Sequence, residues 1–240
     1  MAENPLGLGI ATRRVLADVV TDDLRDAIIA HELEPGRRLA EDDLANQMGV
    51  SRGPVREALA RLEREGLIVI ERHKGARVAS WGRADVEEIF SLRLVLEQLA
   101  IEWACKNATA ADIAALEAPI KEFRKLSEKD RTVKVVSRLD LEFHTAIFTA
   151  AHHDRLHRAW EILRSQIHSF LIYTWTQDEL VNLTYMNSWD KDHQVFVDIV
   201  KSRDIEKGHR EMKVHMERGL ARVSKHFVGD DSNSLSQKRA

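Results

Sequence analysis

The sequence has 240 residues, which is enough for two modest domains with a sizeable hydrophobic core in the larger one. Its net charge of −3 excludes a uniformly basic protein that coats nucleic acid, although a local basic face stays compatible with DNA binding. No segment approaches the ~20 consecutive apolar residues of a membrane-spanning helix, so no membrane association is expected. The single cysteine, Cys105, excludes an intramolecular disulfide, and these features together predict a cytoplasmic protein.

The first predicted helix covers residues 12–31. Its apolar residues repeat at helical spacing and share one side, namely Val15, Val19, Leu24, Ile28 and Ile29. Residues 1–11 lack the basic and apolar layout of a signal peptide and are expected to form a flexible arm. Pro35 and Gly36 break the chain after the helix.

A short helix is predicted from Glu41 to Met48, ending at Gly49, and a second helix begins after Ser51. Serine is a favourable residue at the N-cap of a helix. The second helix carries an inward stripe of Val55, Leu59 and Leu62. A short helix, a tight turn containing glycine and a second helix together form a helix-turn-helix pattern.

Small and basic residues stand at the start of this second helix. Arg52 and Arg56 lie within about 40° of each other around the helix axis, and Gly53 between them would let another backbone approach closely. Two guanidinium groups in this position suit phosphate contacts and bidentate recognition of guanine in a major groove. The alternative is a solvated helix whose arginines pair with Glu57 and Glu63.

Two strands are predicted next, over residues 67–71 and 76–79. A hairpin after a helix-turn-helix is the outline of a winged helix, with His73 and Gly75 at the tip of the wing. This part of the chain is locally basic through Arg52, Arg56, Arg61, Arg64, Arg72, Lys74 and Arg77. Because local charge matters more for DNA binding than the overall sum, we expect a DNA-binding domain over residues 12–80.

This region resembles the winged helix-turn-helix of the GntR family. The matching residues are Glu34-Pro35-Gly36-Arg37-Arg38-Leu39, Leu44-Ala45, Gly49-Val50-Ser51-Arg52, Pro54-Val55-Arg56-Glu57-Ala58-Leu59, Leu62 and Glu65-Gly66-Leu67. The resemblance implies that operator DNA is contacted by Ser51, Arg52, Arg56 and Gly75. The chain departs from some members at Asp42, where they carry a DNA-contacting arginine, and this leaves the base preference at that position open.

Residues 81–83 are predicted to form a linker, and the pattern is helical from residue 84 onward. The predicted helices cover residues 84–107, 110–128, 132–152, 154–175, 188–202 and 204–227, with an irregular or partly helical connector at 176–187. Near-continuous helix with short connections predicts an antiparallel all-α bundle of six helices over residues 84–228. Residues 229–240 are polar, which predicts a disordered tail.

Four polar residues fall on helix faces that are otherwise apolar: Asp140, His144, His193 and His215. Their apolar neighbours at helical spacing are Val136, Phe143, Ile147, Trp189, Phe196, Val197, Met212 and Met216. Burying an unpaired carboxylate is costly, so something must compensate it. Three histidines and one aspartate that converge inside a bundle would form a set of nitrogen and oxygen ligands suited to zinc or a similar divalent ion.

The same pattern has a structural explanation. A carboxylate four residues before a histidine is also the spacing of an ordinary hydrogen bond on a helix surface. The chain has 11 histidines, and a single histidine on an apolar face is more often a satisfied core residue than a metal ligand. The spacing alone leaves both interpretations open.

Arg93 is a further charged residue on an apolar helix face, together with Phe90 and Leu96. A buried guanidinium needs a carboxylate or phosphate partner. Glu97 at i+4, or Asp140 from another helix, is the structural candidate, and an anionic ligand is the functional one. A divalent ion beside this arginine would make a pocket that holds a small carboxylate from both sides.

Residues 84–227 resemble the FCD ligand-binding domain, the effector module of the FadR branch of GntR regulators. The resemblance rests on the Arg93/Glu97 and Asp140/His144 pairs at i, i+4, followed by His193 and His215. It implies a divalent metal, often zinc, at Asp140, His144, His193 and His215, and effector contact at Arg93. The length is closer to the six-helix variety of this domain than to the seven-helix variety.

These features predict a transcription regulator and not an enzyme, with double-stranded operator DNA and a small carboxylate as partners. Because one recognition helix reads too few base pairs for useful specificity, we expect a homodimer on a palindromic operator. The working hypothesis is a repressor whose operator affinity is controlled by the acid. Three alternatives stay open: a regulator that responds to the metal itself, a metal-dependent hydrolase, and a purely structural metal.

Overall fold

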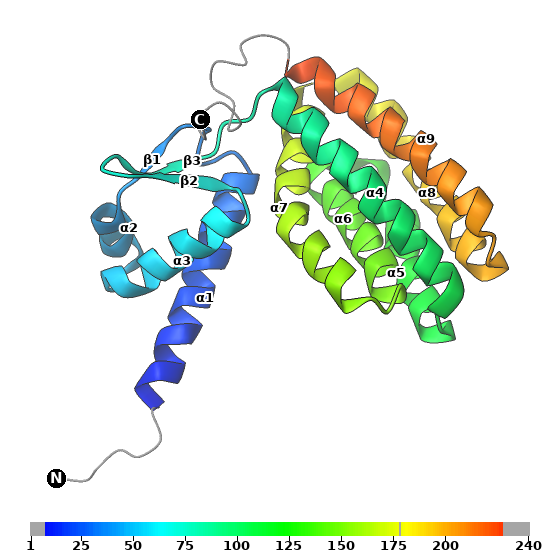
Figure 1. The fold of residues 1–240 in the computed structure, drawn as a ribbon. Coiled ribbons are helices and arrows are strands. Elements are labelled where there is room, and N and C mark those ends of the chain that lie inside the picture. The colour runs from blue at the N-terminus through cyan, green and yellow to red at the C-terminus, as the bar shows by residue number, and fades with distance from the viewer. Residues whose placement is uncertain (1–7, 178, 228–240) are drawn as a thin grey trace. The chain divides into compact units, whose positions relative to one another are not determined.

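The computed structural model describes residues 8–177 and 179–227, and it divides into two compact units, Met1–Ser80 and Trp81–Ala240 (Figure 1). Residues 1–7 of the expected arm and the expected tail at 229–240 lie outside the described residues. The remaining residues of the expected arm, 8–11, belong to the first helix.

The N-terminal unit is a winged helix-turn-helix, as predicted. Its elements are α1 (Leu8–Ile29), β1 (Arg38–Leu39), α2 (Glu41–Met48), α3 (Arg52–Arg64), β2 (Ile68–Glu71) and β3 (Gly75–Val78). The strands form an antiparallel sheet in the order β1-β3-β2, with Arg38 opposite Arg77 and Glu71 opposite Gly75. Strand β1 was not predicted, because two residues are too short to show an alternating pattern.

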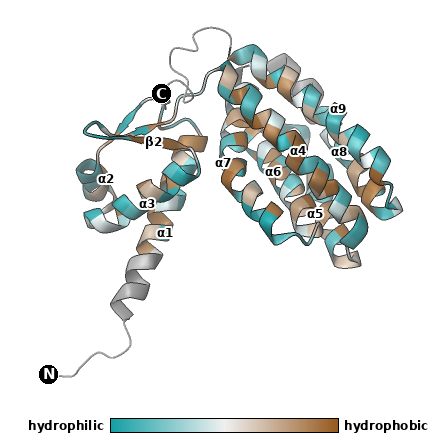
Figure 2. Cartoon of the chain, in the orientation of Figure 1, coloured by the Kyte–Doolittle hydropathy of each residue, from teal (hydrophilic) through white to brown (hydrophobic). Residues whose placement is uncertain are grey.

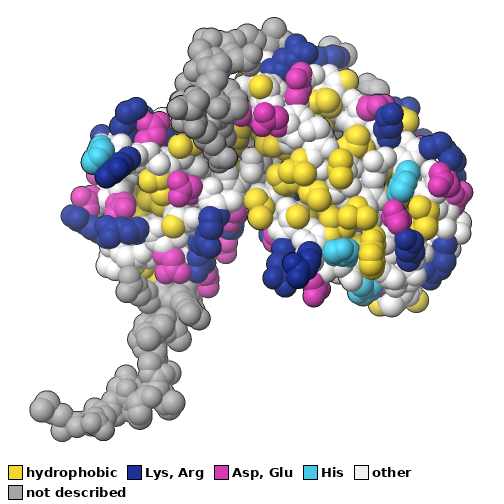
Figure 3. Space-filling model, viewed as in Figure 1, with side chains coloured by type: hydrophobic (Ala, Val, Ile, Leu, Met, Phe, Trp, Pro, Cys, Tyr) yellow, Lys and Arg dark blue, Asp and Glu magenta, His cyan; other side chains and the backbone are white. Residues whose placement is uncertain are grey.

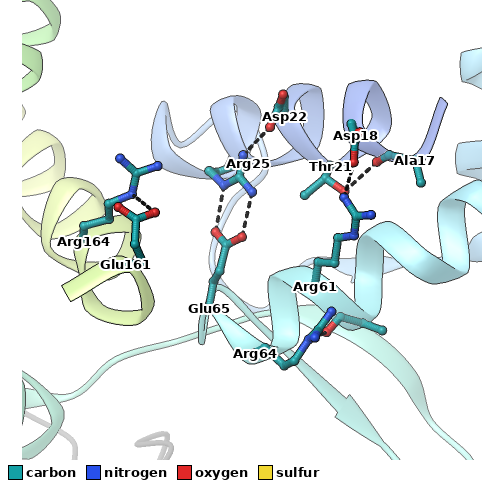
Figure 4. A network of polar contacts seen from close by, with 11 residues as sticks. Ala17, Asp18, Thr21, Asp22, Arg25, Arg61, Arg64, Glu65, Glu161 and Arg164 are labelled. Carbon is teal, nitrogen blue, oxygen red and sulfur yellow. Dashed lines mark hydrogen bonds and ion pairs between the residues drawn. The ribbon is translucent and has the colours of Figure 1, made fainter. Parts of the chain in front are cut away.

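Polar contacts join α1 to α3 and its C-cap along the edge of their packed faces (Figure 4). Arg25 on α1 donates from Nη2 and Nε to the two oxygens of Glu65 at 2.6 and 2.7 Å, and Arg61 on α3 pairs with Asp18. The buried apolar residues of the two helices include Ala17, Val20, Leu24, Ile28, Val55, Ala58, Leu59 and Leu62. This packing holds α3 by one side, so its other side, with Arg52 and Arg56, stays exposed.

The C-terminal unit is an all-α bundle, as predicted. Its helices are α4 (Arg83–Asn107), α5 (Ala110–Lys125), α6 (Val133–Ala150), α7 (Asp154–Gln177), α8 (Glu179–Ser202) and α9 (Ile205–Val223). The largest difference from prediction is in α8, which was expected to begin at residue 188 and begins at Glu179. Most of the expected connector is therefore helical, which is consistent with its lack of any proline or glycine that would end a helix.

One hydrophobic core runs through the bundle and is built around Phe143, Phe148, Trp160, Trp189 and Phe196. In Figure 2 the helices of this unit alternate between hydrophobic and hydrophilic residues along their length, as amphipathic helices do. Gly208 permits the close approach of α9, because a Cβ atom there would lie 3.3 Å from side-chain atoms of Ile101 on α4 and Ile199 on α8. Along the described part of the chain, none of the helices combines the length and hydrophobicity needed to cross a membrane.

Candidate functional site

The start of α3 presents two arginines to solvent. Gly49 after α2 has a φ of 64°, in the left-handed region that glycine favours, and this allows the tight turn into α3. Ser51 occupies the N-cap position as predicted, but its hydroxyl makes no capping hydrogen bond. The side chains of Arg52 and Arg56 are 67% and 71% exposed, and Gly53 lies between them in the first turn.

These arginines pair with carboxylates of α2 and not with those of their own helix. Arg52 pairs through Nε with Asp42, and Arg56 Nη2 donates to Glu41 Oε2 at 2.8 Å. Glu57, an expected partner, pairs with Arg61 at 2.8 Å instead. The intrahelical pairing considered from the sequence is therefore wrong, because the turn at Gly49 brings the first turn of α2 close to the first turn of α3.

The predicted wing is the hairpin of β2 and β3. His73 and Gly75 are exposed near its tip, with φ values of 66° and 84°. Lys74 between them pairs with Glu71 at 2.8 Å. Glycine adopts such a φ at little cost, whereas a histidine in this region is uncommon.

Three histidine side chains from three helices converge inside the C-terminal bundle. His144 of α6, His193 of α8 and His215 of α9 each place one ring nitrogen within 4.8 Å of those of the other two. Asp140 lies beside them, with Oδ1 3.2 Å from His193 Nε2 and Oδ2 4.0 Å from His144 Nε2. The structure thus brings together the four polar residues that the sequence placed on apolar faces, and we refer to them as the His₃Asp cluster.

Hydrogen bonds fix the orientation of two of these rings. His144 Nδ1 lies 2.7 Å from Glu97 Oε2, and since a carboxylate only accepts, Nδ1 carries the proton. His193 Nδ1 donates in the same way to the backbone carbonyl oxygen of Trp189 at 2.7 Å. The Nε2 atoms of both rings therefore present lone pairs to the cluster, where both are buried without a hydrogen bond.

This arrangement fits a bound cation. His193 Nε2 and Asp140 Oδ1 lie 3.2 Å apart in a buried site, which is unfavourable unless a proton or a metal cation lies between them. Trp189 Nε1 donates to the same Oδ1 at 3.0 Å and holds the carboxylate in place. Imidazole nitrogens with one carboxylate are ligands that zinc and similar divalent ions accept.

The electrostatics of the cluster favour an ionised Asp140 and a neutral His215. Burial opposes the ionisation of Asp140, but His193, His144 and Arg93 hold the pKa of that carboxyl well below its usual range. Burial lowers the pKa of His215 well below its usual value, and nearby His193 and His144 lower it further. At neutral pH Asp140 is therefore charged and His215 is neutral.

Arg93 on α4 is buried and pairs through Nε with Glu97 Oε1 at 2.8 Å, one of the two partners considered from the sequence. Its guanidinium carbon lies 5.9 Å from the ring centroids of both Phe90 and Trp160. The ion pair uses Nε and leaves the two terminal amino groups of the guanidinium outside it. Despite the burial of Glu97, His144 and Arg93 lower the pKa of its carboxyl group.

Two residues have roles that were not expected from the sequence. Glu97 was expected only as a partner of Arg93, but its second oxygen orients His144. No role was assigned to Trp189, which contacts the cluster through its indole N–H and its carbonyl oxygen. The available signal was the spacing of Trp189 four residues before His193 on one helix face.

Comparisons with known proteins agree with this division of the chain. Residues 16–78 match the gntR family of bacterial regulatory proteins, and residues 88–218 match the FCD domain. The HTH-type transcriptional regulator YdhC of Bacillus subtilis is 29% identical over 192 residues, which cover 80% of this chain and 84% of YdhC. The gluconate operon transcriptional repressor of Bacillus licheniformis is 29% identical over 185 residues, which cover 77% of this chain and 75% of the repressor.

Solved structures show the same architecture. McbR/YncC of E. coli matches with a TM-score of 0.74 and 25% identity, covering 88% of this chain and 98% of that chain. A GntR-family transcriptional regulator from Pseudomonas syringae pv. tomato str. DC3000 matches with a TM-score of 0.52 and 29% identity, covering 94% of this chain and 89% of that one.

Proposed function

The chain belongs to the GntR-family regulators that carry an FCD domain, and on that premise we propose that it is a repressor controlled by a small organic acid bound at a metal centre. DNA-binding transcriptional regulation is the general role of this family and of this chain. The observation that carries the finer proposal is the buried His₃Asp cluster beside a buried arginine. The name of one relative, a gluconate operon transcriptional repressor, supports repression as the direction of control. A DNA-binding role supports a cytoplasmic location as part of this proposal.

The proposed metal ligands are Asp140, His144, His193 and His215, and the proposed metal is zinc. The support is the two buried Nε2 lone pairs that face the Asp140 carboxylate without a hydrogen bond. A zinc ion held by these four side chains would accept an oxygen of a carboxylate by expanding its coordination from four to five. Such a site in a DNA-binding regulator favours sensing over catalysis.

The proposed effector contact is Arg93. A guanidinium forms bidentate contacts with a carboxylate, and the terminal amino groups of Arg93 lie outside its pair with Glu97. The flanking rings of Phe90 and Trp160 make the surroundings of the guanidinium apolar. A small acid is therefore the class of ligand that this position favours.

The route from the acid toward the DNA-binding unit begins at the same arginine. Phe90 belongs to a small hydrophobic cluster with Phe170, and Trp81 packs on that cluster edge-on to the Phe170 ring, with 4.9 Å between centroids. Trp81 is the first residue of the C-terminal unit. An acid that draws Arg93 away from Glu97 would change the packing of Phe90 in this hydrophobic cluster. That change would in turn shift Trp81, where the chain enters the C-terminal unit. Such coupling requires that the acid bind two arrangements of the protein with different affinities.

The proposed DNA contacts are Ser51, Arg52, Gly53 and Arg56 of the reading helix, with His73 and Gly75 of the wing. All six residues lie on exposed or partly exposed parts of the N-terminal unit. The start of α3 offers to a major groove two guanidinium groups and a serine hydroxyl that makes no capping hydrogen bond.

A homodimer is proposed because one such helix reads too few base pairs. An exposed apolar stripe on α4 supports a second copy of the chain as the partner. Leu92, Val95 and Leu99 repeat along one side of this helix and are 48%, 62% and 37% exposed. Figure 3 shows hydrophobic side chains gathered on the face of the C-terminal unit where α4 lies in Figure 1.

In vitro selection from a random pool of DNA duplexes tests the proposed DNA contacts. The wild-type chain should enrich a palindromic sequence. Arg52→Ala and Arg56→Ala should each weaken binding to it by about 5- to 150-fold, with an unchanged circular dichroism spectrum because both side chains are exposed. Arg64→Ala, an exposed arginine later in α3, is the matched control and should retain most of the affinity.

A titration of the zinc-loaded protein on its selected operator with a panel of small carboxylates tests the sensor. At least one acid should weaken operator binding, and Arg93→Gln should remove that effect while zinc remains bound. A change of operator affinity with zinc alone would identify a regulator that responds to the metal itself. Consumption of the acid would identify an enzyme. An operator affinity that changes with none of the acids and not with zinc would disprove the proposed sensing role.

A further inference from the structure

The two arginines at the start of α3 are held in different ways by neighbouring carboxylates of α2. Arg52 makes its nearest contact with Asp42 through Nε. Arg56 turns one edge of its guanidinium to Glu41, with Nη2 2.8 Å from Oε2 and Nε 3.2 Å from both oxygens. The nearest contact is thus made by Nε in Arg52 and by a terminal amino group in Arg56, so the two guanidinium groups meet α2 differently.

Asp42 lies in the first turn of α2, beside the arginines at the start of α3. Its side chain is 57% exposed and accompanies arginines that we propose to contact DNA, whereas the side chain of Glu41 is 35% exposed. An exposed ion pair changes a folding equilibrium by a factor of about five at most. The favourable position of a carboxylate in the first turn of α2 is shared with Glu41 and Asp43, so it does not single out Asp42. The negative charge of Asp42 opposes the phosphate backbone, which is the main source of affinity for any DNA sequence.

A carboxylate on Nε also determines how the arginine meets DNA. With Nε engaged, the guanidinium points its two terminal amino groups outward, which is one arrangement that reads the O6 and N7 atoms of guanine. The partial neutralisation by Asp42 makes a lone phosphate oxygen a weaker competitor for Arg52. Both effects favour a base contact over a backbone contact.

We propose that Asp42 is a specificity-determining residue that positions Arg52 to read a guanine and lowers the affinity of the protein for non-operator DNA. This inference rests on the proposed DNA-reading role of α3.

The test compares Asp42→Asn with Asp43→Asn in the full chain. Asp43 is the next residue in the same turn of α2, is exposed, and in the described part of the chain pairs with neither Arg52 nor Arg56. The two substitutions remove the same charge from the same turn, and only the first removes the partner of Arg52. Binding is measured by fluorescence anisotropy at fixed salt on the selected operator, on operators with each guanine replaced in turn, and on a mixed-sequence duplex.

We expect Asp42→Asn to bind the mixed-sequence duplex about two- to fivefold more tightly than the wild type. We also expect a loss of about three- to tenfold in discrimination at one guanine, the same guanine whose replacement Arg52→Ala no longer detects. Asp43→Asn should keep the wild-type discrimination at every position. A fold defect would not produce this pattern, because it would weaken binding to all duplexes.

Two results would overturn the inference, and they have different meanings. If Asp42→Asn and Asp43→Asn change the affinity for DNA equally and keep full discrimination, Asp42 acts only through its charge and does not position Arg52. The proposed DNA-reading role of α3 is then unaffected. If the wild-type chain enriches no sequence from the random pool, the proposed reading role of α3 fails, and the role of Asp42 fails with it.

Discussion

Glu97 Oε2 lies 2.7 Å from His144 Nδ1, and both side chains are completely buried within the bundle. The carboxylate fixes the tautomer of the ring and raises the basicity of the Nε2 atom that faces the His₃Asp cluster. Its other oxygen accepts from Arg93. One carboxylate thus connects the proposed metal centre to the proposed effector contact.

Glu97→Gln should therefore weaken zinc binding although Glu97 is not a proposed ligand. We expect a loss of about 10- to 100-fold in affinity, because a neutral amide supports the ligating ring less than a carboxylate does. Competition with a chromogenic chelator measures the loss. Glu102→Gln, on the same helix but partly exposed, is the control and should bind zinc as the wild type does. Equal affinities in all three proteins would contradict this role of Glu97.

Removal of the metal should lower the thermal stability of the protein. A ligand at 100 times its Kd stabilises the folded state by ~2.7 kcal/mol, which corresponds to a shift of about 5–10 °C in Tm for a chain of this size. Calorimetry with and without EDTA measures the shift. His215→Ala should abolish it, whereas His209→Ala, on the same helix outside the His₃Asp cluster, should keep it. A wild-type Tm that is the same with and without EDTA would argue against a bound metal.

The thiol of Cys105 should be inert in the folded protein. Burial raises its pKa to about 11, although nearby Arg203 acts to lower it. At pH 8 only about one thiol in a thousand is then ionised, so a disulfide reagent should react slowly until denaturant exposes the residue. Because the folded pKa lies above the ordinary one, this thiol favours the folded state below about pH 9, and its contribution declines as the pH rises toward about 11. Complete labelling of the native protein within minutes would contradict this description.

The bidentate pair of Arg25 and Glu65 should stabilise the N-terminal unit. Both side chains are largely buried, with 23% and 19% of their surface exposed, so solvent screens the pair less than a surface pair. Glu65→Gln should lower the free energy of unfolding by about 1 kcal/mol, measured by urea denaturation. Asp23→Asn, an exposed carboxyl on α1, is the control, and a larger effect there would contradict the assignment.

A charge on the exposed stripe of α4 should disrupt the proposed homodimer. Val95 is 62% exposed, so Val95→Glu should leave the monomer folded but place a carboxylate in the apolar interface. Sedimentation velocity should show a dimer for the wild type and a monomer for Val95→Glu. Ala114→Glu, at an exposed position on α5, should remain a dimer. A dimeric Val95→Glu variant would place the interface elsewhere.

Local features of this protein were predictable from the sequence because their causes lie within a few residues of one another. Gly49 ends α2 in the left-handed conformation, and Ser51 occupies the N-cap position of α3. The helical period also identified Asp140 and His144 as polar residues on an apolar face, and both are buried.

The tertiary structure alone decided which distant side chains meet. Arg52 and Arg56 pair with Asp42 and Glu41 of α2 and not with the carboxylates of their own helix. The turn between α2 and α3 decides this, because it brings the first turns of the two helices together. Glu97 reaches His144 across 47 positions of sequence, through the packing of α4 against α6. Helical periodicity determines which face of a helix is buried, but the crossing of helices and the rotamers of their side chains determine what that face contacts.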